Sequence, residues 1–149
     1  MMMRLAVRIV AVSEGQILLV RYRDSDGDWY TTPGGGVERG ETLEEAFHRE
    51  VSEELGITTE FGRILMMREV IADRLPRNNL PAGFHQLEVF VKTRIDRSQD
   101  LKTSEPDPGQ TGLDWLPLGR LHDVRFFPAS LRREFVEQDW PEFYYGNIE

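Results

Sequence analysis

Residues 35–57 constrain the chain more than any other stretch, because they carry the marks of a helix with defined ends. Thr42 followed three residues later by Glu45 is a capping-box pattern, and Gly56 stands where a helix exits through a left-handed residue. Between these ends an apolar residue recurs every four positions, at Leu43, Phe47, Val51 and Leu55. The spacing predicts a helix from about 43 to 55 that packs this stripe against a core.

A neighbouring face of the same helix carries carboxylates. Glu50, Glu53 and Glu54 stand at i, i+3 and i+4, which makes them side-by-side neighbours. Each like-charge pair costs roughly 0.2 to 0.5 kcal/mol, so a bound divalent cation with oxygen ligands is an economical reason for the arrangement. Arg49 lies four residues before Glu53 and can hold that carboxylate in a ligating orientation. A merely solvated acidic face is the alternative interpretation.

The stretch resembles the Nudix box, the signature of the Nudix hydrolase family. That pattern reads Gly, five residues, Glu, seven residues, Arg-Glu, an aliphatic, any residue, Glu-Glu, any residue, Gly and an aliphatic. The chain matches every fixed position, with Gly35, Glu41, Arg49, Glu50, Val51, Glu53, Glu54, Gly56 and Ile57. At a residue usage of roughly 7% each, seven fixed identities coincide by chance about once in 10⁸ trials.

The resemblance implies an α/β fold, an α/β/α sandwich with a mixed β-sheet, in which the box presents glutamates to Mg²⁺ or Mn²⁺. Carried over by residue, it implies Glu50, Glu53 and Glu54 as metal ligands, the main-chain carbonyl of Gly34 as a further ligand, and Arg49, Glu50 and Glu53 as catalytic residues. Glu50 is the expected general base, although family members differ in which carboxylate activates the water.

The activity that this resemblance implies is metal-dependent hydrolysis of the P–O–P bridge in a nucleoside diphosphate linked to another moiety. A nucleoside triphosphate, a nucleotide sugar, a dinucleotide and a coenzyme all remain open as the substrate. The alternative is a catalytically silent Nudix-like module that binds or senses a nucleotide. The usual sign of such a module is a lost box glutamate, and none is lost here.

Length and composition set further bounds. A chain of 149 residues suits one domain, residues 1–149. A net charge of −8 argues against a general surface for nucleic acid, although seven glutamates between Glu38 and Glu54 account for much of it. The absence of cysteine excludes disulfides and thiolate chemistry. The sequence contains no run of 18 apolar residues, so it predicts no membrane-spanning segment. We therefore expect a cytoplasmic protein without a membrane partner.

The remaining segments predict a small mixed domain. Residues 4–12 and 16–23 are expected to form an antiparallel hairpin, residues 84–95 a strand, and residues 127–140 an amphipathic helix. The loop at 72–83 is expected to face either the substrate or a partner in a possible homodimer. The aromatic tail, residues 141–149, is expected to pack on a neighbour.

A further metal ligand is expected outside the box. In the Nudix family an acidic residue from a loop before a Trp-containing strand often joins the metal site, and LDWLPL resembles that strand. Glu105 and Asp107 in the loop at 96–112, and Glu88 in the preceding strand, are the three candidates. No motif decides between them.

Overall fold

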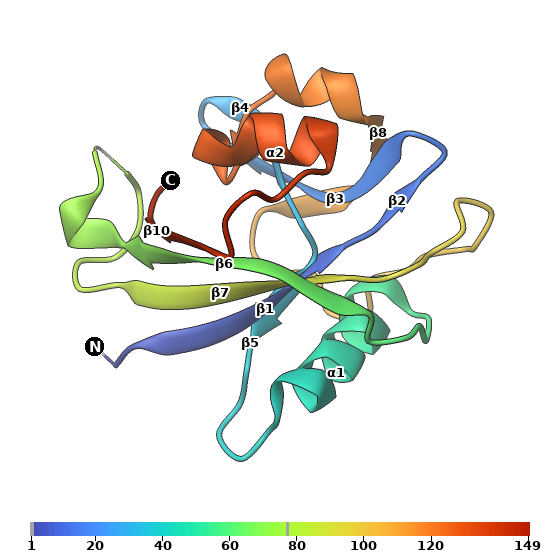
Figure 1. Ribbon diagram of the computed structural model, residues 1–149, viewed down its shortest axis with the longest axis horizontal. Coiled ribbons are helices and arrows are strands. Elements are labelled where there is room, and N and C mark those ends of the chain that lie inside the picture. The colour runs from blue at the N-terminus through green and yellow to red at the C-terminus, as the bar shows by residue number, and fades with distance from the viewer. Residues whose placement is uncertain (1, 77) are drawn as a thin grey trace.

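The computed structural model describes residues 2–76 and 78–149, and within them two β-sheets and two α-helices (Figure 1). Three short 3₁₀ turns join the larger elements: η1 (Ala72–Arg74), η2 (Leu118–His122) and η3 (Ala129–Leu131). In the described residues no helix is long and apolar enough to cross a membrane.

The first sheet is mixed, as expected. Its order is β10 (Tyr144–Asn147), β6 (Arg63–Ile71), β7 (His85–Lys92), β1 (Arg4–Val10) and β5 (Gly34–Gly36). β1 runs parallel to β7 and antiparallel to β5, while β6 runs antiparallel to β7 and parallel to β10. The glycine strand β5 is therefore an edge strand.

The second sheet is centred on β3. It comprises β2 (Val12–Ser13), β3 (Gln16–Asp24), β4 (Gly27–Thr31), β9 (Phe126–Phe127) and β8 (Gln110–Pro117). β3 pairs antiparallel with β2, β4 and β8, so the Trp-containing strand β8 lies beside it.

The expected hairpin of residues 4–12 and 16–23 is wrong for most of its length. Only Val12 and Ser13 pair with β3, and Leu18 N donates to Ala11 O at 3.0 Å. β1 belongs to the other sheet, where both of its edges are paired. The reason is burial on both faces: Val7 and Ile9 enter one core and Val10 the other, so β1 is a central strand rather than one arm of a hairpin.

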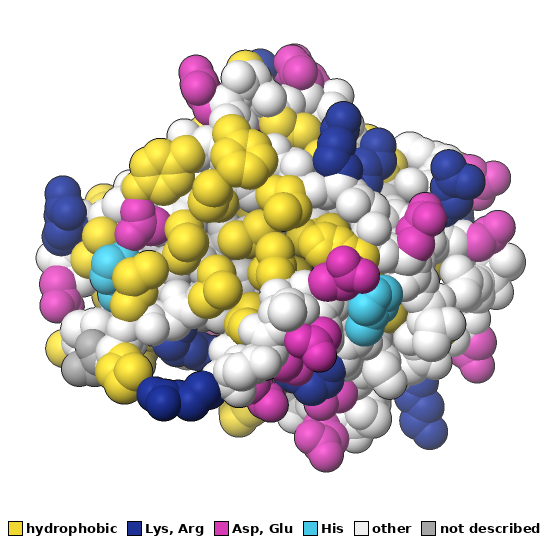
Figure 2. All heavy atoms as spheres, turned by 60° about the horizontal axis from the view of Figure 1, so that its bottom comes forward, with side chains coloured by type: hydrophobic (Ala, Val, Ile, Leu, Met, Phe, Trp, Pro, Cys, Tyr) yellow, Lys and Arg dark blue, Asp and Glu magenta, His cyan; other side chains and the backbone are white. Residues whose placement is uncertain are grey.

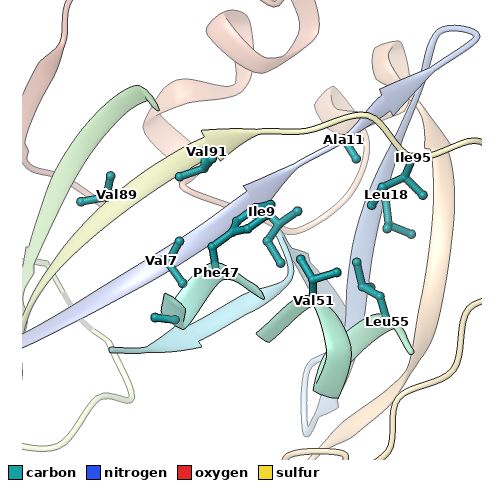
Figure 3. Packing of buried hydrophobic residues seen from close by; sticks show 11 residues of the cluster. Val7, Ile9, Ala11, Leu18, Phe47, Val51, Leu55, Val89, Val91 and Ile95 are labelled. Atoms are coloured by element: carbon teal, nitrogen blue, oxygen red, sulfur yellow. The ribbon is translucent and has the colours of Figure 1, made fainter. Parts of the chain in front are cut away.

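The helix α1 (Leu43–Leu55) has the expected bounds and covers one face of the first sheet. Phe47, Val51 and Leu55 are fully buried and face the strands, where they meet Val7 and Ile9 (Figure 3). The opposite core packs under α2 (Arg132–Glu137) and is closed by aromatic contacts of Phe135. The C-terminal helix is thus present but shorter than the expected 127–140.

α1 covers only part of its side of the first sheet. The cross-strand register places Leu5, Met67, Ile71, Leu87 and Tyr144 on that side, beyond the helix; these five residues are the open face. Leu5 is 36% exposed and Tyr144 is 52% exposed. Figure 2 shows hydrophobic side chains gathered on this side of the molecule.

The aromatic tail packs on its own chain. Tyr144 and Asn147 pair with β6, so the tail adds the outermost strand β10 to the first sheet. Beside it His85 shares a 2.7 Å hydrogen bond with Glu69, which also accepts from the Tyr144 hydroxyl. His85 therefore has a hydrogen-bonding role at this edge.

Candidate active site

Local hydrogen bonds set where α1 begins and ends. The Thr42 hydroxyl accepts from Glu45 N at 3.0 Å, and Thr42 N donates back to the Glu45 carboxylate at 2.9 Å. At the other end Gly56 has φ 68° and donates to Ser52 O at 3.0 Å. With both ends set and the apolar stripe buried, the acidic face of the helix has one orientation, toward β5.

The glycine strand forms a cradle for Glu50. This glutamate is only 7% exposed, and a Cβ at position 35 would lie 2.5 Å from its Oε1. Any side chain at position 35 would therefore occupy the place of the carboxylate. Gly34 is required for a different reason, since its φ of +139° is unfavourable for other residues and a Cβ there would lie 2.1 Å from Val7 O.

Arg49 ties the acidic residues to the loop before the helix. Its guanidinium donates to the two oxygens of Glu41 at 2.6 and 2.9 Å, and to Gly36 O at 2.9 Å. It also donates to Glu50 Oε1 at 2.8 Å and to Glu53 Oε2 at 3.3 Å. The expected contact with Glu53 is present, and Arg49 orients a second carboxylate as well.

Glu54 is the carboxylate with least compensation. It is 7% exposed, and its Oε2 has no hydrogen-bond partner among the described residues. Burial is the largest cause that raises the pKa of Glu54 to about 7, and the carboxylates of Asp107 and Glu50 contribute to the same rise. Burial also raises the pKa of Glu50, against the opposing effect of Arg49.

These groups surround one cavity of about 210 Å³. It is lined by Arg4, Gly34, Gly35, Gly36, Glu50, Glu53, Glu54, Glu105 and Asp107. Gly34, Glu50, Glu53 and Glu54 are thus brought together as the sequence predicted, and Arg49 is bonded to two of them. Their roles as ligands and base remain predictions.

Of the three candidates for an additional acidic ligand, Glu105 and Asp107 line the cavity and Glu88 does not. Glu88 is 3% exposed and lies outside the cavity lining, where it pairs with Arg68 at 2.7 Å and Arg8 at 3.3 Å. Alternation along β7 explains this, because Glu88 shares a face with Phe90, which enters the α2 core. The interpretation of Glu88 as a metal-site residue is therefore wrong.

The residues present fit a divalent cation. The donor set is entirely oxygen, as Mg²⁺ and Mn²⁺ prefer, and it includes a buried carboxylate oxygen with no partner in the described residues. Over the same residues, no three acidic or histidine side chains are already drawn together as a ready metal cluster. Arg49 accounts for part of this, since it holds an oxygen of both Glu50 and Glu53.

Two residues near the site are not marked as site residues by any motif in the sequence. Arg4 at the start of β1 reaches over Gly36, where a Cβ would lie 2.5 Å from its Nη2, and it makes no ion pair with the described residues. Tyr22 of β3 donates its hydroxyl to Asp107 Oδ2 at 3.3 Å. Neither belongs to the box, and both come from strands that only tertiary pairing places beside it.

Comparison with known proteins agrees with this geometry. The family model described as "NUDIX domain" matches residues 2–138. The chain is 29% identical over 146 residues to the RNA pyrophosphohydrolase of Psychrobacter cryohalolentis, covering 90% of this chain and 82% of that protein. It is 58% identical over 50 residues to the NAD-capped RNA hydrolase NudC of Pasteurella multocida, a match that spans 33% of this chain and only 19% of that protein.

A solved structure extends the likeness to the fold. The MutT NUDIX hydrolase from Burkholderia pseudomallei has a TM-score of 0.70 and 27% sequence identity, with coverage of 93% of this chain and 98% of that one. The expected Nudix fold of the α/β class is confirmed. Because the family model spans most of its length, the chain belongs to the family of NUDIX-domain hydrolases.

Proposed function

We propose that this protein is a metal-dependent pyrophosphohydrolase that cleaves the P–O–P bridge of a nucleoside diphosphate linked to another group. The observation that carries the proposal is the buried oxygen of Glu54 that has no partner among residues 2–76 and 78–149, beside Glu50 in its glycine cradle. A folded protein rarely leaves a buried carboxylate uncompensated unless a ligand completes it.

The proposed cation is Mg²⁺ or Mn²⁺. Glu50, Glu53, Glu54 and the carbonyl of Gly34 would hold it, with Asp107 as the additional ligand. Asp107 is favoured over Glu105 because its charge acts directly on Glu54, whose pKa it raises. When bound, the cation supplies an acidified water and neutralises charge on the phosphate oxygens.

The chain's own residues would do the remaining work. Glu50 accepts the proton of the attacking water, and its buried position favours that role because burial raises its pKa toward neutrality. Arg49 fixes the orientation of the Glu50 carboxylate through its 2.8 Å hydrogen bond. Arg4 provides a cation in the cavity lining for a substrate phosphate. With no cysteine in the chain, direct hydrolysis is favoured over a covalent intermediate.

The second candidate substrate is the 5′ end of an RNA. Two relatives are named for such activities, an RNA pyrophosphohydrolase and an NAD-capped RNA hydrolase. The net charge of −8 favours a small nucleotide, since a long polyanion would need a basic track. The silent binding module is disfavoured because all the box glutamates are present, and Glu50, Glu53 and Glu54 line one cavity.

A substrate screen in ¹⁸O-labelled water tests the proposal. Nucleoside triphosphates, nucleotide sugars, dinucleotides and 5′-triphosphorylated RNA would be incubated with Mg²⁺, and their products identified by mass. We expect cleavage between two phosphorus atoms, one label in one phosphate product, and no turnover with excess chelator. Turnover that persists in chelator, or label only on carbon, would exclude the mechanism.

The open face supports the homodimer that the sequence suggested. Glu69, which the register places opposite Leu87, is already bonded to His85 and Tyr144, so two copies meeting there do not bring an unpaired Glu69 carboxylate together. Two copies meeting through their acidic α1 faces would repel. We therefore propose a second copy of this chain as its occupant, and sedimentation tests it: Leu5→Asp should convert a dimer to a monomer, whereas a monomeric parent would refute it. A cytoplasmic location likewise stays a proposal, to be tested by fractionation.

A further inference from the structure

The loop before β8 is fastened to the end of α1. In this acidic loop, residues 101–109, Lys102 N donates to Leu55 O at 2.9 Å, Thr103 Oγ1 to Glu54 O at 2.8 Å, and Ser104 N to Glu53 O at 2.9 Å. These donors satisfy carbonyls that the end of a helix leaves open. The first half of the acidic loop is therefore attached to the backbone of the residues that carry the site carboxylates.

The second half of the acidic loop is fastened to β3. Gly109 O accepts from Arg23 N at 2.9 Å, and Gln110 Oε1 accepts from Asp107 N at 3.1 Å. Between these attachments the Asp107 side chain is exposed, and its one hydrogen-bond donor among the described side chains is the Tyr22 hydroxyl, at 3.3 Å. The backbone of the loop is thus set by several bonds, but the direction of the Asp107 carboxylate depends on Tyr22.

Tyr22 is itself held rigidly. Its ring stacks on Trp29 with the centroids 4.5 Å apart, and Trp29 in turn meets the edge of Phe127 at 5.8 Å. A tyrosine hydroxyl is protonated at neutral pH, so at 3.3 Å from Asp107 Oδ2 it acts as a donor.

We propose that Tyr22 is a positioning residue that holds the Asp107 carboxylate at the cavity, so that a divalent cation meets this ligand already in place. The proposal rests on the proposed function, and specifically on Asp107 as a ligand. A partner behind a metal ligand acts mainly on metal affinity, and its loss typically costs about 10- to 100-fold in affinity or activity. The Tyr22 hydroxyl should therefore affect how tightly metal binds more than how fast the bound substrate reacts.

The test is Tyr22→Phe, which keeps the ring and its stacking on Trp29 and removes only the hydroxyl. Binding of Mn²⁺ alone to the full chain would be measured by electron paramagnetic resonance, and kcat as a function of Mg²⁺ concentration. We expect Mn²⁺ affinity about tenfold weaker, with kcat at saturating Mg²⁺ lowered less than about threefold. Asp107→Asn should weaken Mn²⁺ binding at least as much, and the double variant no further than Asp107→Asn alone.

Tyr144→Phe is the matched control. It also removes a tyrosine hydroxyl that donates to a carboxylate, that of Glu69, but at the far edge of the sheet. It should leave Mn²⁺ affinity unchanged. If Tyr22→Phe binds Mn²⁺ as tightly as the parent while Asp107→Asn does not, the positioning role is refuted and the ligand stands. If Asp107→Asn also binds normally, the proposal fails with its ligand, whereas chelator-sensitive hydrolysis would still support the function.

Discussion

Two buried glutamates, Glu54 in α1 and Glu88 in β7, show opposite electrostatic behaviour. Glu54 is 7% exposed and Glu88 is 3% exposed, so both have left water. Burial raises the pKa of Glu54 to about 7. Burial acts on Glu88 in the same direction, but Arg8 and Arg68 overcome it and lower its pKa to about 2.

The difference lies in the countercharge. Glu88 accepts hydrogen bonds from Arg8, Arg68 and Gln86, so its charge is compensated within the chain. Glu54 has a free oxygen within the described structure, and the like charges of Asp107 and Glu50 act on it more strongly than the positive charge of Arg8. The first arrangement links three β-strands, β1, β6 and β7. The arrangement around Glu54 is unfavourable until a cation binds, which is the state expected of an empty cation site.

The largest effect should come from removing a carboxylate on the uncompensated side. Glu53→Gln or Glu54→Gln should abolish most hydrolysis, because losing several kcal/mol of charge stabilisation lowers the rate by more than about a hundredfold. Steady-state kinetics at saturating Mg²⁺ measure this, with Glu44→Gln on the exposed side of α1 as the control. Full activity in either variant would remove the metal-ligand assignment.

The next effect should appear on the compensated side, in stability rather than activity. Glu88→Gln leaves the buried Arg68 and the half-buried Arg8 without their shared carboxylate, and breaking a buried pair typically costs about 3 to 5 kcal/mol. Denaturant unfolding in chelator should show this loss. In the same assay Glu54→Gln should be as stable as the parent or more stable. Equal destabilisation by both variants would contradict the proposed difference between Glu54 and Glu88.

The smallest effect is a difference in pH dependence. The pKa of Glu54 is higher in the folded than in the unfolded protein. Its side chain therefore contributes nothing to the free energy of unfolding in acid, and it destabilises the metal-free protein as pH rises from about 4.5 to about 7. Glu54→Gln should therefore match the parent at pH 4 and exceed its stability by on the order of 2 kcal/mol at pH 8.

The contribution of Glu88 to stability depends on pH in the opposite direction. Its pKa is lower folded than unfolded, so its contribution is complete above about pH 4.5 and is lost as pH falls toward 2. The stability gap between Glu88→Gln and the parent should narrow over that acid range. Thermal unfolding across pH, in chelator, checks both glutamates; a gap for Glu54→Gln that is independent of pH would contradict the assignment of its raised pKa.

Most of the site residues could be predicted from the sequence because they lie close together along the chain. The cap of α1 is made by residues three apart, its stripe repeats every four, and Glu50, Glu53 and Glu54 share a face of one helix. Such relations depend on helix geometry alone. The bounds of α1 and the shared face of its glutamates therefore followed from the helix pattern, whereas Gly34 beside them was implied by the resemblance to the Nudix box.

The strands could be recognised but not paired. Alternation placed Glu88 and Phe90 on one face of β7, yet only the fold shows that Phe90 enters the α2 core and that Glu88 does not line the cavity. The tail forms the edge strand β10. β1 has one face in each of the two cores and does not pair with β3. Strand partners are chosen by complementary burial over the whole chain, which a local pattern does not contain.

What the sequence by itself determined is the helix, its acidic face and the family to which they belong. What only the tertiary structure decided is which charges are compensated: Glu88 meets Arg68 twenty residues away, while Asp107 meets Tyr22 eighty-five residues away. The physical reason is that a hydrogen bond within a helical turn follows from backbone geometry, whereas one between distant segments exists only after the sheets have brought them together.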